Sequence, residues 1–352
     1  MDIMFLLEKE KLKIDAVMEK YFPRIYSKNS LEKIAGKSEY DYDVAAVNKS
    51  IADPIWNLLD RGGKRWRPFM FLVILEALEA DVKKNYDFCV IPEIIHNGTL
   101  LIDDIEDKGE TRRGKPCVHK IFGDDIAINA GNMMYFMPLY LFKNSNLNEK
   151  IKTRLYEIYI QEMINISFGQ GMDIAWHKGL SESVSVKQYL QMCAYKTGTL
   201  ARMSAKLAAI IAEADAKTTE KVGLFAESLG IAFQIQDDIL DVVSKNRKSF
   251  GKVYGNDIIE GKRSLMVVHT LNKANREDKK QLILILNAEK KTKEQIESAI
   301  KLLKKYNSIE FAKKKSREIL SKAWSRLDPA LNNNNGKSKL KALGDFLIER
   351  EI

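Results

Sequence analysis

The chain has 352 residues, of which 45% are hydrophobic, and its formal net charge is +9. A chain of this size can bury a sizeable core, and its charge favours anionic partners such as phosphorylated small molecules, acidic membranes or nucleic acid. Three cysteines without paired spacing speak against a disulfide framework and a zinc site, and they predict a reducing, cytoplasmic location. No apolar run approaches the roughly 20 residues that span a bilayer, and the N-terminal apolar stretch is too short for a signal peptide.

Apolar residues recur at helical spacing along most of the chain, and no convincing strand alternation is present. The pattern predicts a polar loop or short helix at 27–43, a basic loop at 109–116, and helices at 3–21, 43–59, 68–80, 85–107, 124–142, 148–176, 186–213, 218–244, 260–275, 277–287, 292–307, 309–326 and 338–350. The sequence has no repeat with a solenoid period, and no change of composition marks a linker between domains. One all-α domain over residues 1–352 is therefore the simplest prediction.

The helix predicted at 85–107 ends in three aspartates, Asp103, Asp104 and Asp107, and the pattern returns at Asp237, Asp238 and Asp241. Helix residues i and i+4 share a face and residue i+1 lies about 100° further round, so the three carboxylates of each triplet can point into one cavity. Carboxylates this close repel one another unless a cation neutralises them, and oxygen ligands suit Mg²⁺. One triplet alone can be a solvated acidic face. Two matched triplets favour facing helices that hold several metal ions and a polyphosphate.

Basic residues gather in glycine-containing segments near both triplets: Lys64 and Arg67 after Gly62-Gly63, Arg112 and Arg113 before Gly114, Lys196 before Thr197-Gly198, Lys252 after Gly251 and Lys262 after Gly261. Backbone NH groups at a helix start and paired guanidinium groups are good ligands of phosphate. His96 lies two turns before the first triplet on the same face as Asp103. The alternatives are structural: a glycine pair that only caps a helix, a buried histidine, and ordinary surface lysines.

No serine, cysteine or histidine nucleophile with an adjacent base can be assembled from the sequence, which speaks against covalent catalysis. Carboxylate triplets beside several cations suit a reaction in which diphosphate is the leaving group and metal ions neutralise its charge. The residues upstream of the first triplet are largely apolar, so a hydrocarbon bonded to a diphosphate is the substrate that the pattern favours.

These motifs, in this order, resemble the trans-type isoprenyl diphosphate synthases, or polyprenyl synthetases. The resemblance covers residues from about 50 to 275 and rests on Gly62-Gly63-Lys64-x-x-Arg67-Pro68, His96, the two aspartate triplets, Arg112-Arg113-Gly114, Lys196-Thr197-Gly198, Gln234, Gly251-Lys252 and Gly261-Lys262-Arg263. It implies an all-α, single-domain helical bundle around a central cavity, usually a homodimer. The motif-bearing part would span about 43–275, and helices over 276–352 would follow it.

The resemblance also implies roles for these residues. The six aspartates would hold about three Mg²⁺ ions on an allylic diphosphate, which Arg112, Lys196, Lys252 and Lys262 would also bind. Thr197 and Gln234 would lie near the hydrocarbon end of that substrate. The diphosphate of isopentenyl diphosphate would be held by Lys64, Arg67, His96 and Arg113. The reaction implied is ionisation of the allylic C–O bond, attack by the isopentenyl double bond and loss of a proton.

In this family, bulk about one turn before the first triplet acts as a floor for the growing chain. Here Gly98 and Thr99 are small, and the first triplet resembles that of geranylgeranyl-type (C20) enzymes. We therefore predict a deeper floor, formed by Ile91, Ile95 and residues of the next helix such as Met133, Met134 or Phe136. A Gly98→Phe substitution should then shorten the product.

Four alternatives remain open on the sequence. A farnesyl (C15) or a longer-chain synthase would differ only in product length. A terpene cyclase would share the fold but replace the second triplet and dispense with Lys64, Arg67 and His96. A non-catalytic subunit of a heteromeric synthase tends to lose a triplet, and both triplets are intact here. Nucleic-acid binding rests on the +9 charge alone, and no aromatic and basic residues interleave as in a base-stacking surface.

Overall fold

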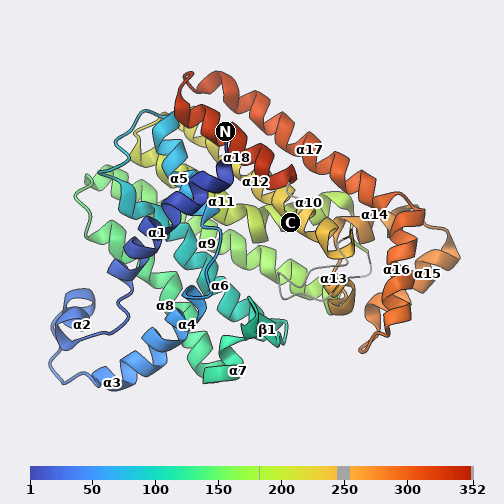
Figure 1. Ribbon diagram of the computed structural model, residues 1–352, viewed down its shortest axis with the longest axis horizontal. Helices are drawn as coiled ribbons and strands as arrows, with labels where there is room; N and C mark the ends of the chain where they lie inside the picture. The colour runs from blue at the N-terminus through green and yellow to red at the C-terminus, as the bar shows by residue number, and fades with distance from the viewer. Residues whose placement is uncertain (182, 244–253, 350–352) are drawn as a thin grey trace.

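The computed structural model describes residues 1–181, 183–243 and 254–349, and this part of the chain is helical apart from one short hairpin (Figure 1). The helices of the first half are α1 (Ile3–Tyr21), α2 (Lys28–Ala35), α3 (Val44–Val47), α4 (Asp53–Leu59), α5 (Trp66–Ala77), α6 (Ile91–Glu106), α7 (Val118–Phe122), α8 (Asp124–Lys143) and α9 (Glu149–His177). Those of the second half are α10 (Val186–Cys193), α11 (Thr199–Ile211), α12 (Ala216–Val243), α13 (Asn256–Glu260), α14 (Leu265–Lys273), α15 (Arg276–Asn287), α16 (Lys293–Lys305), α17 (Ser308–Leu327) and α18 (Asn335–Glu349).

Helix α11 forms the centre of the bundle. All but one of its residues are buried, and it packs against α5, α9 and α12. A helix that is apolar on every side is stable only when other helices surround it. Around it lies the larger hydrophobic core, whereas a second core joins α10, the end of α12 and helices α13–α17. Figure 1 shows α15 and α16 at one end of the molecule, and α2 and α3 at the other.

Helices α6 and α8 cross closely because each has a glycine at the contact. A Cβ atom built on Gly98 would lie 2.9 Å from the Cβ of Met134 and 3.1 Å from the carbonyl oxygen of Gly131. A Cβ atom on Gly131 would in turn lie 2.9 Å from the side chain of Ile102. A side chain at position 98 would therefore push against α8 itself, whereas one at position 131 would first displace the side chain of Ile102.

The structure departs from the sequence prediction in four local features. A two-stranded antiparallel hairpin, β1 (Thr111–Arg112) and β2 (Lys115–Pro116), lies within the predicted basic loop. Its turn residues Arg113 and Gly114 both have positive φ, as a tight hairpin turn requires. A π-helical turn, Asn48–Ala52, divides the helix predicted at 43–59. The segment predicted as one helix at 260–275 is the end of α13, a left-handed Gly261 and then α14. A second π-helical turn, Ala194–Gly198, joins α10 to α11.

None of the helices in the described ranges has a stretch that is long and apolar enough to cross a membrane.

Candidate active site

A cavity of about 1520 Å³ is lined by residues of α1, α5, α6, α8, α9, α12 and α13, among others. It brings together most of the residues that the sequence singled out. From the basic set and its neighbours, its lining contains Lys64, Arg67, His96, Arg112, Arg113, Lys196, Thr197, Gln234 and Lys262. From the aspartate triplets it contains Asp103, Asp237, Asp238 and Asp241. Lys252 lies outside the described residues. The two acidic helix ends thus line the same cavity, as a metal site shared between two helices would require.

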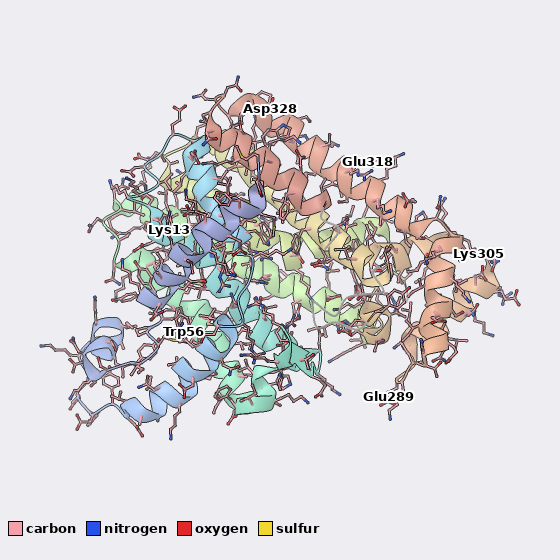
Figure 2. The ribbon with its side chains drawn as sticks, viewed as in Figure 1. Lys13, Trp56, Glu289, Lys305, Glu318 and Asp328 are labelled. Carbon is pink, nitrogen blue, oxygen red and sulfur yellow. The ribbon has the colours of Figure 1, made fainter. Side chains whose placement is uncertain are left out.

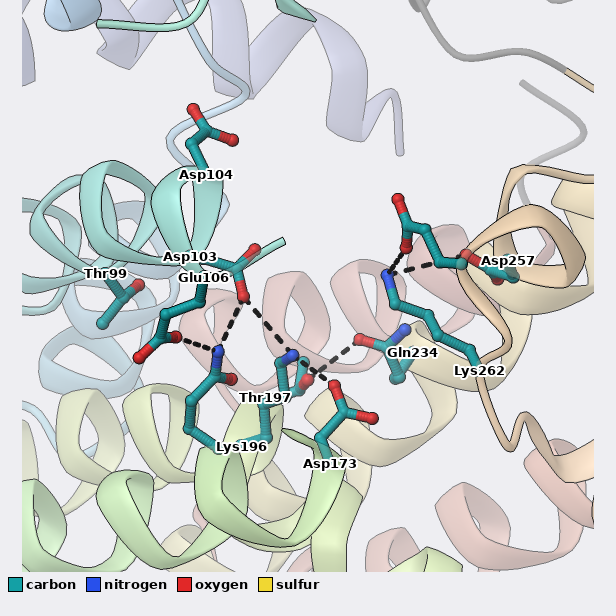
Figure 3. A network of polar contacts seen from close by, with 12 residues as sticks. Thr99, Asp103, Asp104, Glu106, Asp173, Lys196, Thr197, Gln234, Asp257 and Lys262 are labelled. Carbon is teal, nitrogen blue, oxygen red and sulfur yellow. Dashed lines mark hydrogen bonds and ion pairs between the residues drawn. The ribbon is translucent and has the colours of Figure 1, made fainter. Parts of the chain in front are cut away.

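Asp103 is the centre of the contacts on the α6 side (Figure 3). Its Oδ1 atom accepts a hydrogen bond from Nε2 of Gln170 at 3.0 Å and another from Nζ of Lys196 at 3.4 Å, and Arg112 lies 3.7 Å from its other oxygen. Burial alone would raise the pKa of Asp103, but the charges of Lys196, Lys262 and Arg112 outweigh it and hold the pKa below its usual range. This carboxylate is therefore ionised and held in place.

The other two aspartates of the first triplet are not among the described residues that line the cavity, contrary to the expectation that all three point into it. Asp104 is 3% exposed, and its Oδ1 accepts a hydrogen bond from Nε of Arg112 at 2.8 Å. Figure 3 shows its side chain directed away from Asp103. The reason is the hairpin, which places Arg112 beside α6, where the Arg112 carbonyl also accepts a hydrogen bond from Arg61. Asp107 ends the helix, where burial and the charge of Asp103 raise its pKa to about 6.

The second triplet lies wholly on the cavity wall. Asp238 is 5% exposed and accepts hydrogen bonds from Oη of Tyr189 and from Nε2 of Gln234, both at 2.8 Å. Burial and the nearby charge of Asp257 raise the pKa of Asp238 well above its usual range. Oδ2 of Asp241 accepts a hydrogen bond from the backbone NH of Asp257 at 3.1 Å. The donors of this triplet are all carboxylate oxygens, the ligand type that suits a hard divalent cation. In the described part of the chain, no group of three or more acidic, histidine or cysteine side chains converges closely enough to hold one alone.

Lys196 and Thr197 enter the cavity because the backbone there is packed between glycines of two neighbouring helices. A Cβ atom on Gly169 of α9 would lie 2.2 Å from the backbone nitrogen of Lys196, and one on Gly230 of α12 would lie 2.7 Å from the Cα of Gly198. From this position, Nζ of Lys196 donates to Asp173 at 2.5 Å. The Thr197 hydroxyl donates to Gln234 at 2.9 Å and so links the turn to α12.

A second group of cations lines the cavity on the side of α5. Arg67 is 6% exposed, and burial lowers the pKa of Arg67 and that of Arg113 to about 10. Burial and the charges of these two arginines hold the pKa of His96 well below its usual range, so the imidazole is neutral at pH 7. Lys64 lies beside them on the wall. Cations that are buried in this way lose part of their hydration, and a bound anion would compensate for that loss.

The chain-length residues fall into two groups. Thr99 and Phe136 line the cavity, but Gly98, Ile91, Ile95, Met133 and Met134 are not among its described lining residues. Ile91 and Ile95 are fully buried in the hydrophobic core, and Gly98 faces α8 at the helix crossing. The apolar wall is instead formed by Thr99 and Leu100 of α6, Tyr135, Phe136 and Leu139 of α8, and Tyr159, Ile160 and Met163 of α9. Of the residues predicted to form the floor, Phe136 therefore lines the cavity, whereas Ile91, Ile95, Met133 and Met134 are not among its described lining residues.

This placement changes the expected effect of enlarging the two small residues. A phenylalanine at position 98 should separate α6 from α8 and lower the free energy of unfolding by about 1–3 kcal/mol or more, because the contact is already tight. Thr99→Phe should instead fill the cavity and shorten the product by about one isoprene unit, with Thr99→Ser as its control. Chromatography of the dephosphorylated products and urea denaturation measure the two effects. If Gly98→Phe left the free energy of unfolding unchanged, the α6–α8 contact would have room for a side chain at position 98, contrary to this expectation.

Two polar residues of the site were missed by the sequence reasoning. Gln170 donates to Asp103 and, at 2.6 Å, to Glu106, and Asp173 accepts from Lys196. Both lie on α9, at i and i+3, and line the cavity. The signal was present: Gly169-Gln170-Gly171 interrupts a long helix, where two glycines are unfavourable without a close contact.

Comparison with known proteins agrees with this site. Residues 48–303 match the polyprenyl synthetase family. The chain is 33% identical to a short chain isoprenyl diphosphate synthase of Methanocaldococcus jannaschii over 93% of this chain and 96% of that protein. It is 32% identical to a geranylgeranyl diphosphate synthase of Saccharolobus solfataricus, over 86% and 91% of the two chains. The crystal structure of geranylgeranyl pyrophosphate synthetase from Pyrococcus horikoshii superposes with a TM-score of 0.85 at 31% identity, covering 98% of each chain. The all-α fold expected from the sequence is confirmed, and the chain belongs to the polyprenyl synthetase family of trans-prenyltransferases.

Proposed function

We propose that this enzyme condenses isopentenyl diphosphate with an allylic diphosphate (dimethylallyl, geranyl or farnesyl) and forms geranylgeranyl diphosphate (C20) as its main product. The observation that carries the proposal is the single cavity with two acidic helix ends, two groups of cations and one apolar wall. Relatives and a solved structure named as geranylgeranyl diphosphate synthases support the product length. A C25 product is the second candidate, because two relatives at 31% and 30% identity are named geranylfarnesyl diphosphate synthases.

The proposed cofactor is Mg²⁺, with about three ions held by Asp103 on one side of the cavity and by Asp237, Asp238 and Asp241 on the other. The family motif assigns Asp104 and Asp107 to the same role, although the described lining of the cavity does not include them. When bound, the ions would neutralise the diphosphate that leaves the allylic substrate. The chemistry of the donors supports this assignment, because all six are carboxylates. Burial and the charge of Asp103 raise the pKa of Asp107, and burial and the charge of Asp257 raise that of Asp238. A bound cation would favour the ionised form of these carboxylates and so offset the effect of burial and of the neighbouring negative charge.

In this proposal, one group of basic residues binds the allylic diphosphate and a second group binds isopentenyl diphosphate. Lys196 and Lys262, together with Arg112, hold the allylic diphosphate beside Asp103, and Lys252 is assigned to the same group by the family motif. Lys64, Arg67 and Arg113 hold the diphosphate of isopentenyl diphosphate. Neutral His96 donates a hydrogen bond to that group, since a neutral imidazole keeps one NH donor. Thr197 and Gln234 lie next to the first carbons of the allylic chain, and the proton lost from the condensed product goes to the departing diphosphate.

An assay with purified protein tests this function directly. Incubation with isopentenyl diphosphate, Mg²⁺ and each allylic starter in turn should give a C20 prenyl diphosphate, and removal of Mg²⁺ by EDTA should abolish turnover. A product distribution centred on C15 or C25 would replace the C20 assignment. Absence of any condensation with all three starters would overturn the proposed activity.

A homodimer is the assembly that we propose. Large apolar side chains of α8 and α9 are exposed, namely Ile128, Phe136, Ile160, Ile164 and Phe168, and such a surface is typical of an interface. All but Ile128 also line the cavity, so a second copy seated on α8 and α9 would close its apolar end. Light scattering after size-exclusion chromatography measures the mass, and a monomer at micromolar concentration would contradict the proposal.

A further inference from the structure

Helix α1 carries one lysine on its inner face, and no motif of the sequence includes it. The buried residues Ile3, Leu7, Ile14 and Met18 form the apolar stripe that packs α1 onto the bundle. Lys11 follows Leu7 by four residues and precedes Ile14 by three, so it lies within this stripe. Its side chain is 29% exposed. A lysine at a core position of an amphipathic helix must have a polar environment to face, because its charge is costly to bury.

That environment is the active-site cavity. Lys11 and Glu8 are among the residues that line it, as are Lys64, Arg67 and Arg113, and the contact between Asp15 and Arg65 places α1 beside the segment that carries Lys64 and Arg67. The nearest acidic contact of Lys11 is Glu8, whose carboxylate lies 3.8 Å from Nζ and is 64% exposed. This distance is longer than that of a direct hydrogen bond, and an ammonium group has three donors. Lys11 therefore adds a further cation to a cavity whose lining already contains the buried guanidinium groups of Arg67 and Arg113.

Asp15 fixes the position of Lys11 over this group. It lies one turn after Lys11 on the same side of α1, and its Oδ1 accepts a hydrogen bond from Nε of Arg65 at 2.8 Å. The Arg65 side chain is 1% exposed, and its Nη1 also donates to Oε1 of Glu93 on α6 at 3.0 Å. Arg65 follows Lys64 directly and precedes Arg67 by two residues, so the contact ties α1 to the backbone that carries both of these cations.

We infer that Lys11 is a further ligand of the diphosphate of isopentenyl diphosphate and that Asp15, through Arg65, is the residue that positions it. The inference rests on the proposed function. Lys11 would donate a charge-assisted hydrogen bond from a helix outside the family motifs, and α1 would cover the isopentenyl side of the cavity. Such a bond, once lost, weakens binding of the anion by about tenfold or more.

Steady-state kinetics of Lys11→Ala against Lys13→Ala test the inference. Lys13 lies two residues along α1 on the opposite side, is exposed and pairs with Glu10 at 3.0 Å (Lys13 is labelled in Figure 2). Lys11→Ala should raise the KM for isopentenyl diphosphate about tenfold and leave the KM for the allylic diphosphate unchanged, whereas Lys13→Ala should change neither. Lys11→Arg should recover most of the loss. An equal rise of both KM values, or no rise, overturns the inference.

Calorimetry separates binding from turnover. Isopentenyl diphosphate, titrated into the protein without allylic substrate, should bind about tenfold more weakly to Lys11→Ala than to Lys13→Ala. Equal affinities would overturn the role of Lys11. The proposed function is judged separately, because only a lack of turnover by the wild-type enzyme would refute it. Asp15→Asn should weaken the same binding. The double variant Lys11→Ala with Asp15→Asn should bind no more weakly than the weaker single variant, because Asp15 acts through Lys11. Additive losses in the double variant would show that Asp15 has a separate role and would overturn its assignment.

Discussion

Replacing Asp103 by alanine is expected to lower kcat about a thousandfold or more. This carboxylate receives hydrogen bonds from Gln170 of α9 and Lys196 of the π-helical turn, and it lies beside Arg112 of the hairpin. Its loss would remove a proposed metal ligand and leave Lys196 without one of its two acidic contacts. Preorganised charges at a leaving group typically contribute factors of about 10²–10³ each, and two are affected here.

Single-turnover and steady-state rates, measured with saturating Mg²⁺, check this expectation. The control is Asp345→Ala on α18, whose carboxylate contacts Lys341 on the surface. Asp237→Ala, on the opposite wall of the cavity, should cause a loss of similar size. A kcat within tenfold of wild type for either active-site variant would mean that the two acidic helix ends do not act together on one diphosphate.

Replacing Gly169 by alanine is expected to damage both stability and activity. The added methyl group would lie 2.2 Å from the backbone nitrogen of Lys196 and 2.6 Å from the carbonyl carbon of Tyr195. Backbone atoms cannot rotate away as a flexible side chain can, so α9 and the turn Ala194–Gly198 must separate. Overpacking of this kind costs about 1–3 kcal/mol of unfolding free energy. A displacement of about 1 Å in Lys196 and Thr197 should also lower kcat about a hundredfold.

Gly171→Ala is the matched control for stability, because it lies two residues further along the same helix and an added Cβ there would have no atom within 4 Å. It should leave the unfolding free energy unchanged or raise it by up to about 1 kcal/mol, as alanine is the better helix former. Urea denaturation compares the two variants. Equal stabilities, with equal kcat for Gly169→Ala and wild type, would contradict the role given to Gly169.

Helix periodicity and residue spacing predicted much of this molecule. The apolar repeats located the long helices, and the two aspartate triplets correctly indicated two acidic helix ends that face one cavity. The sequence could not show that Asp104 turns towards Arg112. That contact depends on a tight hairpin whose turn includes Arg113, a residue type that rarely takes positive φ. Nor could it show that Lys196 and Thr197 enter the cavity on a π-helical turn, since the cause lies in Gly169 and Gly230, far away in the chain.

The floor of the cavity was the least predictable part, for a related reason. Counting back from Asp103 identifies residues on one side of α6, but two glycines bring α8 against that side at Gly98. The adjoining position, Thr99, is the one that faces the hollow. A difference of one residue on a helix rotates a side chain by about 100°, which is enough to move it from a helix contact to a cavity wall. Which of two small neighbours faces the substrate depends on the crossing partner.

Because Gly169 and Gly230 pack against the turn Ala194–Gly198, the two ends of the cavity differ in how readily they tolerate substitution. A larger residue at position 169 or 230 would displace the turn that carries Lys196, which contacts Asp103. The part of the cavity that we propose to bind diphosphate therefore tolerates little change in these two residues. Thr99 and Phe136 at the opposite, apolar end have no such constraint from that turn. If Thr99 and Phe136 border the growing hydrocarbon as proposed, substitutions there could change product length without disturbing the turn that carries Lys196.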